Sequence, residues 1–328
     1  MTTASLAIVS GYVSKPGSGR KPRWLKSVKK NHQNYASKHG YAYIFREDFA
    51  CSASNTSAHE PFYVGTWSKP TFILDLLNQG YEYVFWIDSD SIFTNFKIGF
   101  DDLIRTQKDL IFSGDAYDVC NAGHLLFRNS DFSKAFLEKW DETRFFNYRD
   151  SGSAADGFWI TADGYGISDQ ANLNALLSKN IETSLDLLEG FNAINGYPEN
   201  PLRKHRDWQK LYSPKTPNYC DQILRDLIRP DLHANVLVVN QRRLNAYPKS
   251  ICGEARYQPR DPLVHFVSDT KDYLVKANII SLLLMSYGIY ITPFIYTYPF
   301  LQPIVALKNR FKQIKRKMIR RIKSFISS

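Results

Sequence analysis

Two acidic side chains follow an apolar run that is long enough for one buried strand. Residues 83–87 read YVFWI, and Asp88, Ser89 and Asp90 come directly after them. In an extended segment, side chains two residues apart point to the same side, so the two carboxylates can converge on one cation. Mg²⁺ and Mn²⁺ accept carboxylate oxygens together with phosphate oxygens of a ligand. The pattern therefore predicts a divalent-metal site, with two solvated carboxylates in a turn as the simpler alternative.

The surrounding sequence alternates strands and helices, which would place this acidic pair at one edge of a sheet. The expected elements are strands at residues 6–9, 41–45, 83–87, 236–240 and 263–267 and helices at 23–39 and 69–77. This order is typical of an α/β fold with a parallel sheet. Open sheets of this kind bind ligands at the carboxyl ends of their strands. Two long irregular stretches, 144–166 and 195–219, are typical of binding loops or lids.

A strand followed by D-x-D also opens the haloacid-dehalogenase-like phosphatases, in which the first aspartate is a nucleophile. Residues 114–118 (GDAYD) superficially resemble the later acidic motif of that class. Only about 25 residues separate the two motifs, which leaves no room for the intervening strand, Ser/Thr and Lys elements. Ile92 also stands where Thr or Val is expected. A metal-dependent phosphohydrolase is therefore the second choice.

Five short motifs in order point to one family. They are WSKP at residues 67–70, WIDSDSIFTN at 86–95, NAGHLLFRN at 121–129, SDQ at 168–170 and HFV at 265–267. Together they resemble the galactosyltransferase/xylosyltransferase family of α-1,2-galactosyl-, xyloglucan α-1,6-xylosyl- and related yeast mannosyltransferases. The resemblance covers residues 60–270 and, more loosely, the N-terminal strand.

The resemblance implies a fold and an activity. The fold would be of GT-A type, a Rossmann-like α/β fold with a mixed, mostly parallel sheet flanked by helices. The activity would be a metal-dependent, configuration-retaining transfer of galactose, xylose or a similar sugar from a nucleotide sugar, expected to be UDP-linked. The acceptor would be a glycan or a glycolipid. Besides the phosphohydrolase, a non-catalytic nucleotide- or sugar-binding protein is an alternative.

The family's metal site can be carried over residue by residue. Asp88 and Asp90 would hold Mn²⁺, or Mg²⁺, on the donor diphosphate, and His265 would be the third protein ligand. Imidazole is a suitable ligand for a first-row metal of this kind. Without the motif, a histidine after Leu263 and Val264 would more often be structural.

The resemblance also implies sugar-binding residues. Asp169 and Gln170 would lie near the anomeric carbon, where an acid can stabilise an oxocarbenium-like transition state. In the alternative interpretation, Ser168 or Asp169 is only the N-cap of a helix over residues 171–177. Both can hold, since a helix N-terminus also favours the charges of a donor site.

The remaining expected donor-binding residues lie at strand ends and at one helix start. Lys69 would approach the diphosphate, although a lone lysine there is more often a surface residue. The full set is Ser10, Gly11, Tyr12, Lys69, Asp88, Ser89, Asp90, Asn121, Ala122 and Gly123. Residues 10–12 would seat the nucleotide, and residues 121–123 would bring a strand close to the sugar. The simpler interpretation of residues 121–123 is an ordinary loop before a strand.

Composition and charge exclude several protein classes. The chain has 328 residues, 44% of them hydrophobic and 23% charged, which excludes a mainly disordered or collagen-like protein. Residues 308–328 hold nine of the 42 Lys and Arg and no acid, so the other 33 nearly balance 32 acids. No nucleic-acid partner is therefore expected. Four scattered cysteines without C-x-x-C argue against a zinc knuckle and favour reduced thiols.

The C-terminal sequence predicts membrane association. Residues 277–307 carry no charge, but three prolines leave at most 16 uninterrupted residues, or about 24 Å of helix against roughly 30 Å of hydrocarbon. Residues 308–328 repeat apolar side chains at helical spacing among cations, which is typical of an interfacial helix on anionic lipid. The alternatives are that 277–307 completes the catalytic core, and that a polyanion such as RNA binds the tail.

These patterns give an expected organisation. Residues 1–276 form the catalytic domain, 277–307 an apolar segment that either inserts into a membrane or completes the core, and 308–328 a basic amphipathic helix. Residues 1–12 lack a basic n-region and a long apolar stretch, so no targeting signal is expected there. The expected location is cytoplasmic and peripheral, on the inner face of a membrane.

Overall fold

The computed structural model describes residues 5–12, 21–22, 24–47, 68–114, 119–143, 169–179, 218–247, 257 and 261–266. All of them belong to the first of two units into which the chain divides, Met1–Ser268. The predicted loop 144–166, most of 195–219 and the whole of 277–328 lie outside the described residues. The predicted domain boundaries therefore stay predictions. Within the described part of the chain, no helix combines the length and apolar character needed to cross a bilayer.

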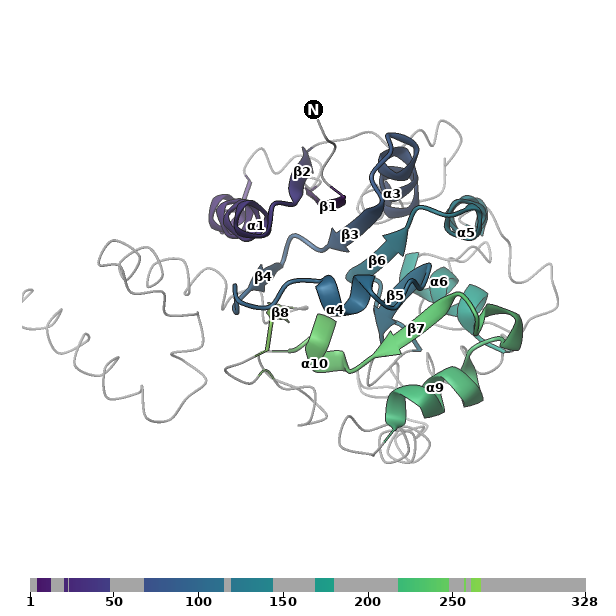
Figure 1. Cartoon of the computed structure of the whole chain (residues 1–328). Helices are drawn as coiled ribbons and strands as arrows, with labels where there is room; N and C mark the ends of the chain where they lie inside the picture. Colours follow the sequence, from purple (N-terminus) through teal and green to yellow (C-terminus); the bar gives the residue numbers. More distant parts are fainter. Residues whose placement is uncertain are drawn as a thin grey trace, which may run out of the picture. The chain divides into compact units, whose positions relative to one another are not determined.

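The centre of the fold is a sheet of six strands, in the order β2-β1-β3-β6-β5-β7 (Figure 1). The strands are β1 (Leu6–Tyr12), β2 (Ala42–Glu47), β3 (Tyr83–Ile87), β5 (Leu110–Ser113), β6 (His124–Arg128) and β7 (Val236–Val239). Strand β6 is antiparallel to β3 and β5, and the other neighbours are parallel. The structure therefore confirms the prediction of a mixed, mostly parallel α/β sheet.

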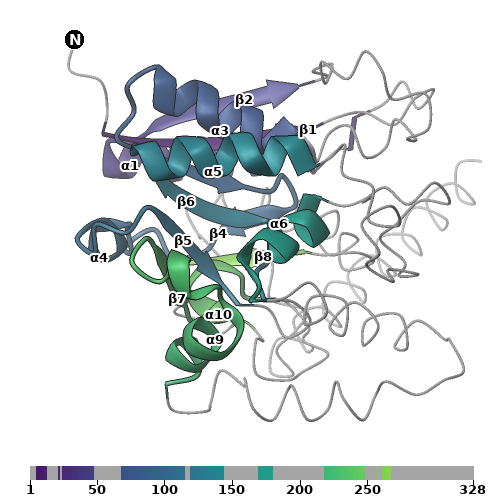
Figure 2. The same cartoon turned by 90° about the vertical axis from the view of Figure 1, so that its right-hand side faces the viewer.

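Helices cover both faces of this sheet, because alternate strand residues point to opposite sides. One core cluster joins the sheet to α3 (Lys69–Asn78), α5 (Asp131–Glu142), α6 (Asp169–Leu177) and α9 (Tyr219–Leu227). The other joins it to α1 (Leu25–His39), α4 (Asp101–Ile104) and α10 (Gln241–Leu244). A short 3₁₀ helix, η3 (Pro230–Leu232), precedes β7. Figure 2 shows α3 and α5 lying side by side along the sheet.

Strand β3 is buried on both faces, as its continuous apolar sequence predicts. Val84 and Trp86 belong to one core cluster, and Tyr83, Phe85 and Ile87 to the other. Burying an aromatic or aliphatic side chain of this size contributes roughly 1.5–3 kcal/mol. The strand is therefore a rigid support for the acidic residues that follow it.

The sequence predicts an extended segment for the two acidic residues, but in the structure they lie in a turn. The Ser91 N–H donates to the Asp88 carbonyl at 3.1 Å, which turns the chain between β3 and β4 (Ser91–Phe93). Strand β4 pairs antiparallel with β8 (Leu263–His265), and Ser91 is in register with His265. The predicted strand 263–267 thus ends at residue 265. The pairing brings His265 to the carboxyl end of β3.

The other predicted elements occur with small shifts. Helix α1 ends at His39, and Gly40, whose φ of 70° lies in the left-handed region, is the C-cap that the sequence predicts. The helix predicted from residue 23 begins at Leu25, and the strand predicted at 41–45 covers Ala42–Glu47. The strand predicted at 236–240 is Val236–Val239.

Candidate active site

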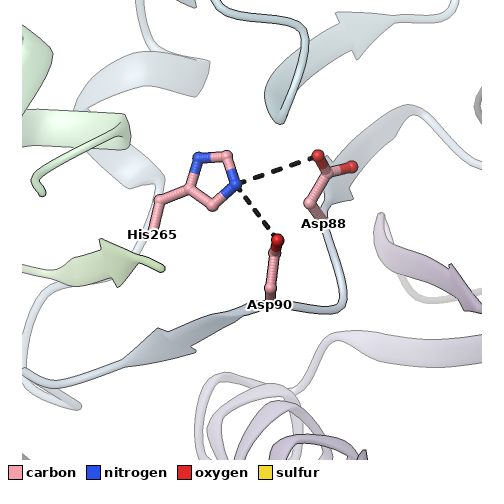
Figure 3. A group of neighbouring side chains, drawn as sticks. All are labelled: Asp88, Asp90 and His265. Carbon is pink, nitrogen blue, oxygen red and sulfur yellow. Dashed lines mark hydrogen bonds and ion pairs between the residues drawn. The ribbon is translucent and has the colours of Figure 1, made fainter. Parts of the chain in front are cut away.

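Three side chains that could hold a metal ion meet at the end of β3 (Figure 3). His265 Nε2 lies 3.1 Å from Asp90 Oδ1 and 3.9 Å from Asp88 Oδ2. One potential ligand atom from each residue lies within 4.8 Å of the other two. Two carboxylates and an imidazole suit Mn²⁺ or a similar divalent ion. The structure therefore brings together the three residues predicted as metal ligands.

Gly123 packs against this group so closely that a side chain would not fit. A Cβ atom at residue 123 would lie 2.7 Å from His265 Cε1 and 3.2 Å from Asp88 Oδ2. It would also lie 2.8 Å from Asn121 Oδ1, which accepts a hydrogen bond from the Gly123 N–H. The Gly123 carbonyl in turn accepts from the Asp88 N–H at 2.9 Å. A glycine is therefore required for the close approach of β6 to the ligands.

The Asp88 carboxylate is held by two donors on the side away from His265. Trp86 Nε1 donates to Asp88 Oδ1 at 2.7 Å, and Lys69 Nζ lies 3.2 Å from the same oxygen. These contacts turn Oδ2 toward His265. The orientation leaves one carboxylate oxygen aimed at the predicted metal position.

Lys69 is a buried residue, so its interpretation as a surface lysine is wrong. Its side chain is 6% exposed, and its ammonium lies 2.8 Å from Asp169 Oδ2 and 3.2 Å from the Ala122 carbonyl. Burial alone would lower the pKa of Lys69, but the attraction of Asp169 and Asp88 outweighs burial and raises it. The lysine therefore stays charged and joins the two acidic groups.

Asp169 is the first residue of α6, so it does not occupy the N-cap position just before the helix. Ser168, the other proposed cap, lies outside the described residues. Burial raises the pKa of the Asp169 carboxyl, and the nearby Lys69 ammonium limits that rise. Trp140 Nε1 donates to the Asp169 carbonyl at 3.0 Å, which fixes the start of the helix. Asp169 is thus buried beside a cation of its own chain.

Helix α6 also holds the segment that precedes β6. Gln170 Oε1 accepts from the Ala122 N–H at 3.1 Å. Asn174 forms hydrogen bonds to both the N–H and the carbonyl of Cys120, at 2.7 and 3.0 Å. The predicted sugar-binding residues Gln170 and Asn121–Gly123 are therefore neighbours, and Lys69 connects them to Asp169 through the Ala122 carbonyl.

The predicted nucleotide-binding residues lie at the same edge of the sheet. Strand β1 is parallel to β3 with Val9 in register with Trp86, so Ser10, Gly11 and Tyr12 continue to the level where β3 turns. Ser10 is buried, and Gly11 and Tyr12 are half-buried. Ser89 is also half-buried, in the turn after β3. These residues thus lie at the same edge of the sheet as Asp88 and Asp90.

Several residues that pack around the ligand group, which consists of Asp88, Asp90 and His265, were not singled out from the sequence. His124 is part of the NAGH motif, and its ring lies 4.9 Å from that of His265. Its Nε2 bonds Ser91 Oγ at 2.9 Å, and burial lowers its pKa well below the usual value, so it is neutral. Asn245 and Tyr247 belong to no motif, and only the fold brings them to His265. Of the phosphatase-like motif, residues 115–118 lie outside the described residues.

Comparison with known proteins places this α/β chain among the glycosyltransferases. The profile of the galactosyl transferase GMA12/MNN10 family matches residues 5–270, and the chain belongs to this family. The match covers every residue of the candidate site. The family resemblance of the sequence is therefore confirmed.

Individual relatives are distant. A probable xyloglucan 6-xylosyltransferase 3 of Arabidopsis thaliana is 26% identical over 207 residues, which are 58% of this chain and 42% of the relative. A probable xyloglucan 6-xylosyltransferase 5 of the same plant is 31% identical over 129 residues, 35% and 25% of the two chains. The chain thus spans less than half the length of these relatives. A crystal structure of a glycosyltransferase involved in the glycosylation of the major capsid of PBCV-1 aligns with a TM-score of 0.45 and 12% identity, over 83% of this chain and 98% of the other.

Proposed function

We propose that the protein is a metal-dependent, retaining glycosyltransferase of GT-A type that uses a nucleotide sugar, expected to be UDP-linked. The acceptor is a glycan or a glycolipid. One observation carries the proposal. The Lys69 ammonium contacts both Asp88, which belongs to the ligand group Asp88–Asp90–His265, and the buried carboxylate of Asp169. A donor has its diphosphate and its sugar at just such neighbouring positions.

The metal end of the site would take the diphosphate. Asp88, Asp90 and His265 would hold Mn²⁺ or Mg²⁺, which when bound neutralises the charge that develops on the leaving nucleoside diphosphate. Gly123 supports this assignment, since it keeps the space beside the three ligands free of a side chain. Residues 10–12 and Ser89, at the same edge of the sheet, would contact the nucleotide.

The other end of the site would take the sugar. A positive charge develops at the anomeric carbon when the bond to the diphosphate breaks, and a fixed carboxylate in a buried site stabilises it. Asp169 is such a carboxylate, and Lys69 favours its ionised form against the effect of burial. Gln170 and residues 121–123 would position the sugar hydroxyls.

A donor screen tests the proposed reaction. The full chain is incubated with Mn²⁺, a panel of nucleotide sugars and simple sugar acceptors, and both the nucleoside diphosphate and the glycoside are measured. We expect nucleoside diphosphate and a glycoside whose anomeric configuration, read by NMR, matches that of the donor. Inorganic phosphate without glycoside would indicate the phosphohydrolase instead. Donor binding without any turnover would indicate a non-catalytic binding protein.

We further propose that the enzyme is cytoplasmic and peripheral on the inner face of a membrane, held by residues 277–328. The support is in the sequence alone: an uncharged stretch, followed by nine cations among regularly spaced apolar residues. Each cation near an anionic surface contributes about 1 kcal/mol. We expect a chain without residues 308–328 to sediment far less with anionic vesicles at low salt. If full-length protein stays in the supernatant as well, this location is wrong.

A further inference from the structure

The ring of His265 is held by a second residue that no motif contains. Asn245, which is fully buried, follows helix α10, and its Oδ1 lies 2.8 Å from His265 Nδ1. An amide oxygen only accepts hydrogen bonds, so Nδ1 must carry the proton. When Nδ1 carries the single proton of a neutral imidazole, the lone pair of Nε2 is available to a metal ion. This is the nitrogen that faces Asp88 and Asp90.

The other end of the Asn245 amide contacts Tyr247. Its Nδ2 donates to the Tyr247 hydroxyl at 3.1 Å, which leaves Oδ1 for His265. The same hydroxyl accepts from Asn121 Nδ2 at 3.1 Å, so it is a shared acceptor for two buried amides. Tyr247 is 6% exposed, and little water can take its place.

The backbone around Asn245 holds His265 as well. The His265 N–H donates to the Ala246 carbonyl at 2.8 Å, and Ala246 forms a parallel bridge with Val264. The segment 245–247 therefore runs along β8 and contacts His265 at both its main chain and its ring. Such a double contact fixes the direction of the Cα–Cβ bond and the rotation of the ring together.

We propose that Asn245 and Tyr247 are positioning residues that keep His265 in the Nδ1–H form, with Nε2 ready to bind the metal. Outer partners that donate or accept at the second imidazole nitrogen commonly set the tautomer of a ligating histidine. In this form Nε2 and Asp90 Oδ1 are two acceptors 3.1 Å apart, which a cation between them stabilises. The inference rests on the metal site of the proposed function and adds the residues that prepare it.

Nitrogen NMR on the metal-free wild-type protein tests the tautomer without any substitution. The full chain is labelled with ¹⁵N-histidine at pH 8, where an ordinary imidazole is neutral. The His265 resonances are assigned from their loss in His265→Gln. We expect a protonated Nδ1, with the Asn245 amide oxygen as its acceptor. An Nδ1 without a proton would overturn the inference, whether or not the protein binds metal.

Manganese affinity, measured by the electron paramagnetic resonance of free Mn²⁺, tests the consequence. Asn245→Leu removes the acceptor at similar size and should weaken Mn²⁺ binding about 10- to 100-fold. Asn245→Asp keeps an acceptor toward Nδ1 and should bind within a few-fold of wild type. Tyr247→Phe frees the amide to rotate and should weaken binding several-fold. Circular dichroism and thermal unfolding show whether each variant is folded.

The outcomes separate this inference from the proposed function. Wild-type protein that binds no Mn²⁺ would contradict the proposed metal site, and the tautomer measurement would still decide the role of Asn245. Wild-type affinity in a folded Asn245→Leu variant would overturn the positioning role and leave the metal site intact. If Asn245→Leu does not fold, the NMR measurement on the wild-type protein decides, and an Nδ1 of His265 without a proton contradicts the inference.

Discussion

Two acidic groups lie near the carboxyl end of β3, Asp169 and the pair of Asp88 and Asp90, and their negative charges are balanced in different ways. Asp169 is 4% exposed and has the ammonium of Lys69 at 2.8 Å. Asp88 and Asp90 face His265, which adds a third ligand atom, and the Asp88 side chain is 25% exposed. The first group is neutralised by the fold, and the second is the group that we propose takes a cation from solution. Lys69 contacts both Asp88 and Asp169, so the two groups share the positive charge of one ammonium.

Asp90→Ala should have the largest effect, because it removes a metal ligand and leaves the Lys69–Asp169 pair unchanged. We expect Mn²⁺ binding to be lost and transfer to fall on the order of a thousandfold. Calorimetric Mn²⁺ titration and the donor assay measure both. Asp101→Ala is the matched control, since Asp101 is exposed on α4. Normal Mn²⁺ affinity in folded Asp90→Ala would show that the cluster is not the metal site.

Lys69→Met should destabilise the fold by about 3 kcal/mol, since it leaves the buried Asp169 without its cation. Urea unfolding measures the loss. The control is Lys139→Met, which breaks an exposed pair with Glu142 and should cost under about 1 kcal/mol. Adding Asp169→Asn to Lys69→Met should recover much of the stability but no activity. Equal losses in both single variants would mean that burial of the pair has no special importance.

Asp169→Asn should separate the two groups in function. The substitution keeps the size of the side chain and removes its charge, so we expect near-normal Mn²⁺ affinity and turnover lower by on the order of a hundredfold. Steady-state assays with saturating donor measure the turnover. Full turnover would show that Asp169 only supports the start of α6.

Gly123→Ala should press on the ligand group from the β6 side. Its Cβ would lie 2.7 Å from His265 Cε1 and 3.2 Å from Asp88 Oδ2, so these two side chains must shift. We expect Mn²⁺ affinity to fall about tenfold, as for other changes that displace a ligand indirectly. The Mn²⁺ titration of a folded Gly123→Ala protein decides it, and an unchanged affinity would show that the ligands tolerate the shift.

His32→Gln should have the smallest effect. It tests an uncharged polar side chain that contacts Ser91, the residue after Asp90. His32 is fully buried, its Nε2 donates to the Ser91 carbonyl, and burial lowers its pKa from 6.5 to about 4. The unfolded chain therefore takes up a proton near pH 6.5 that the folded chain refuses until about pH 4, so stability falls as pH falls through that window. Between pH 6.5 and about 5.5 this loss is about 1 kcal/mol.

Glutamine can donate the same hydrogen bond but does not titrate. Urea unfolding at the two pH values should therefore show a smaller pH-dependent loss in His32→Gln than in wild type. Equal losses in the two proteins would mean that His32 is not the group that takes up the proton.

Local patterns predicted the supports of the site better than its geometry. The run YVFWI predicted β3 with its exact bounds, because a strand buried on both faces must be apolar throughout. The burial of Lys69 could not be predicted, since the two acids that stabilise its charge are 19 and 100 residues away in the chain.

The same limit applies to Asn245 and Tyr247, whose role depends on how α10 leads into the segment along β8. Strands β4 and β5 were also missed, and their pairing partners β8 and β7 lie far away in the sequence.

The pairing of β4 with β8 also has a consequence for the time at which the enzyme becomes competent. His265 meets Asp90 across 175 positions of sequence. Closing so long a loop is entropically costly and slow compared with forming the local β3–β4 turn. During synthesis the two aspartates leave the ribosome long before their third partner. The group Asp88–Asp90–His265 is therefore complete only after nearly the whole matched region of residues 5–270 has been made.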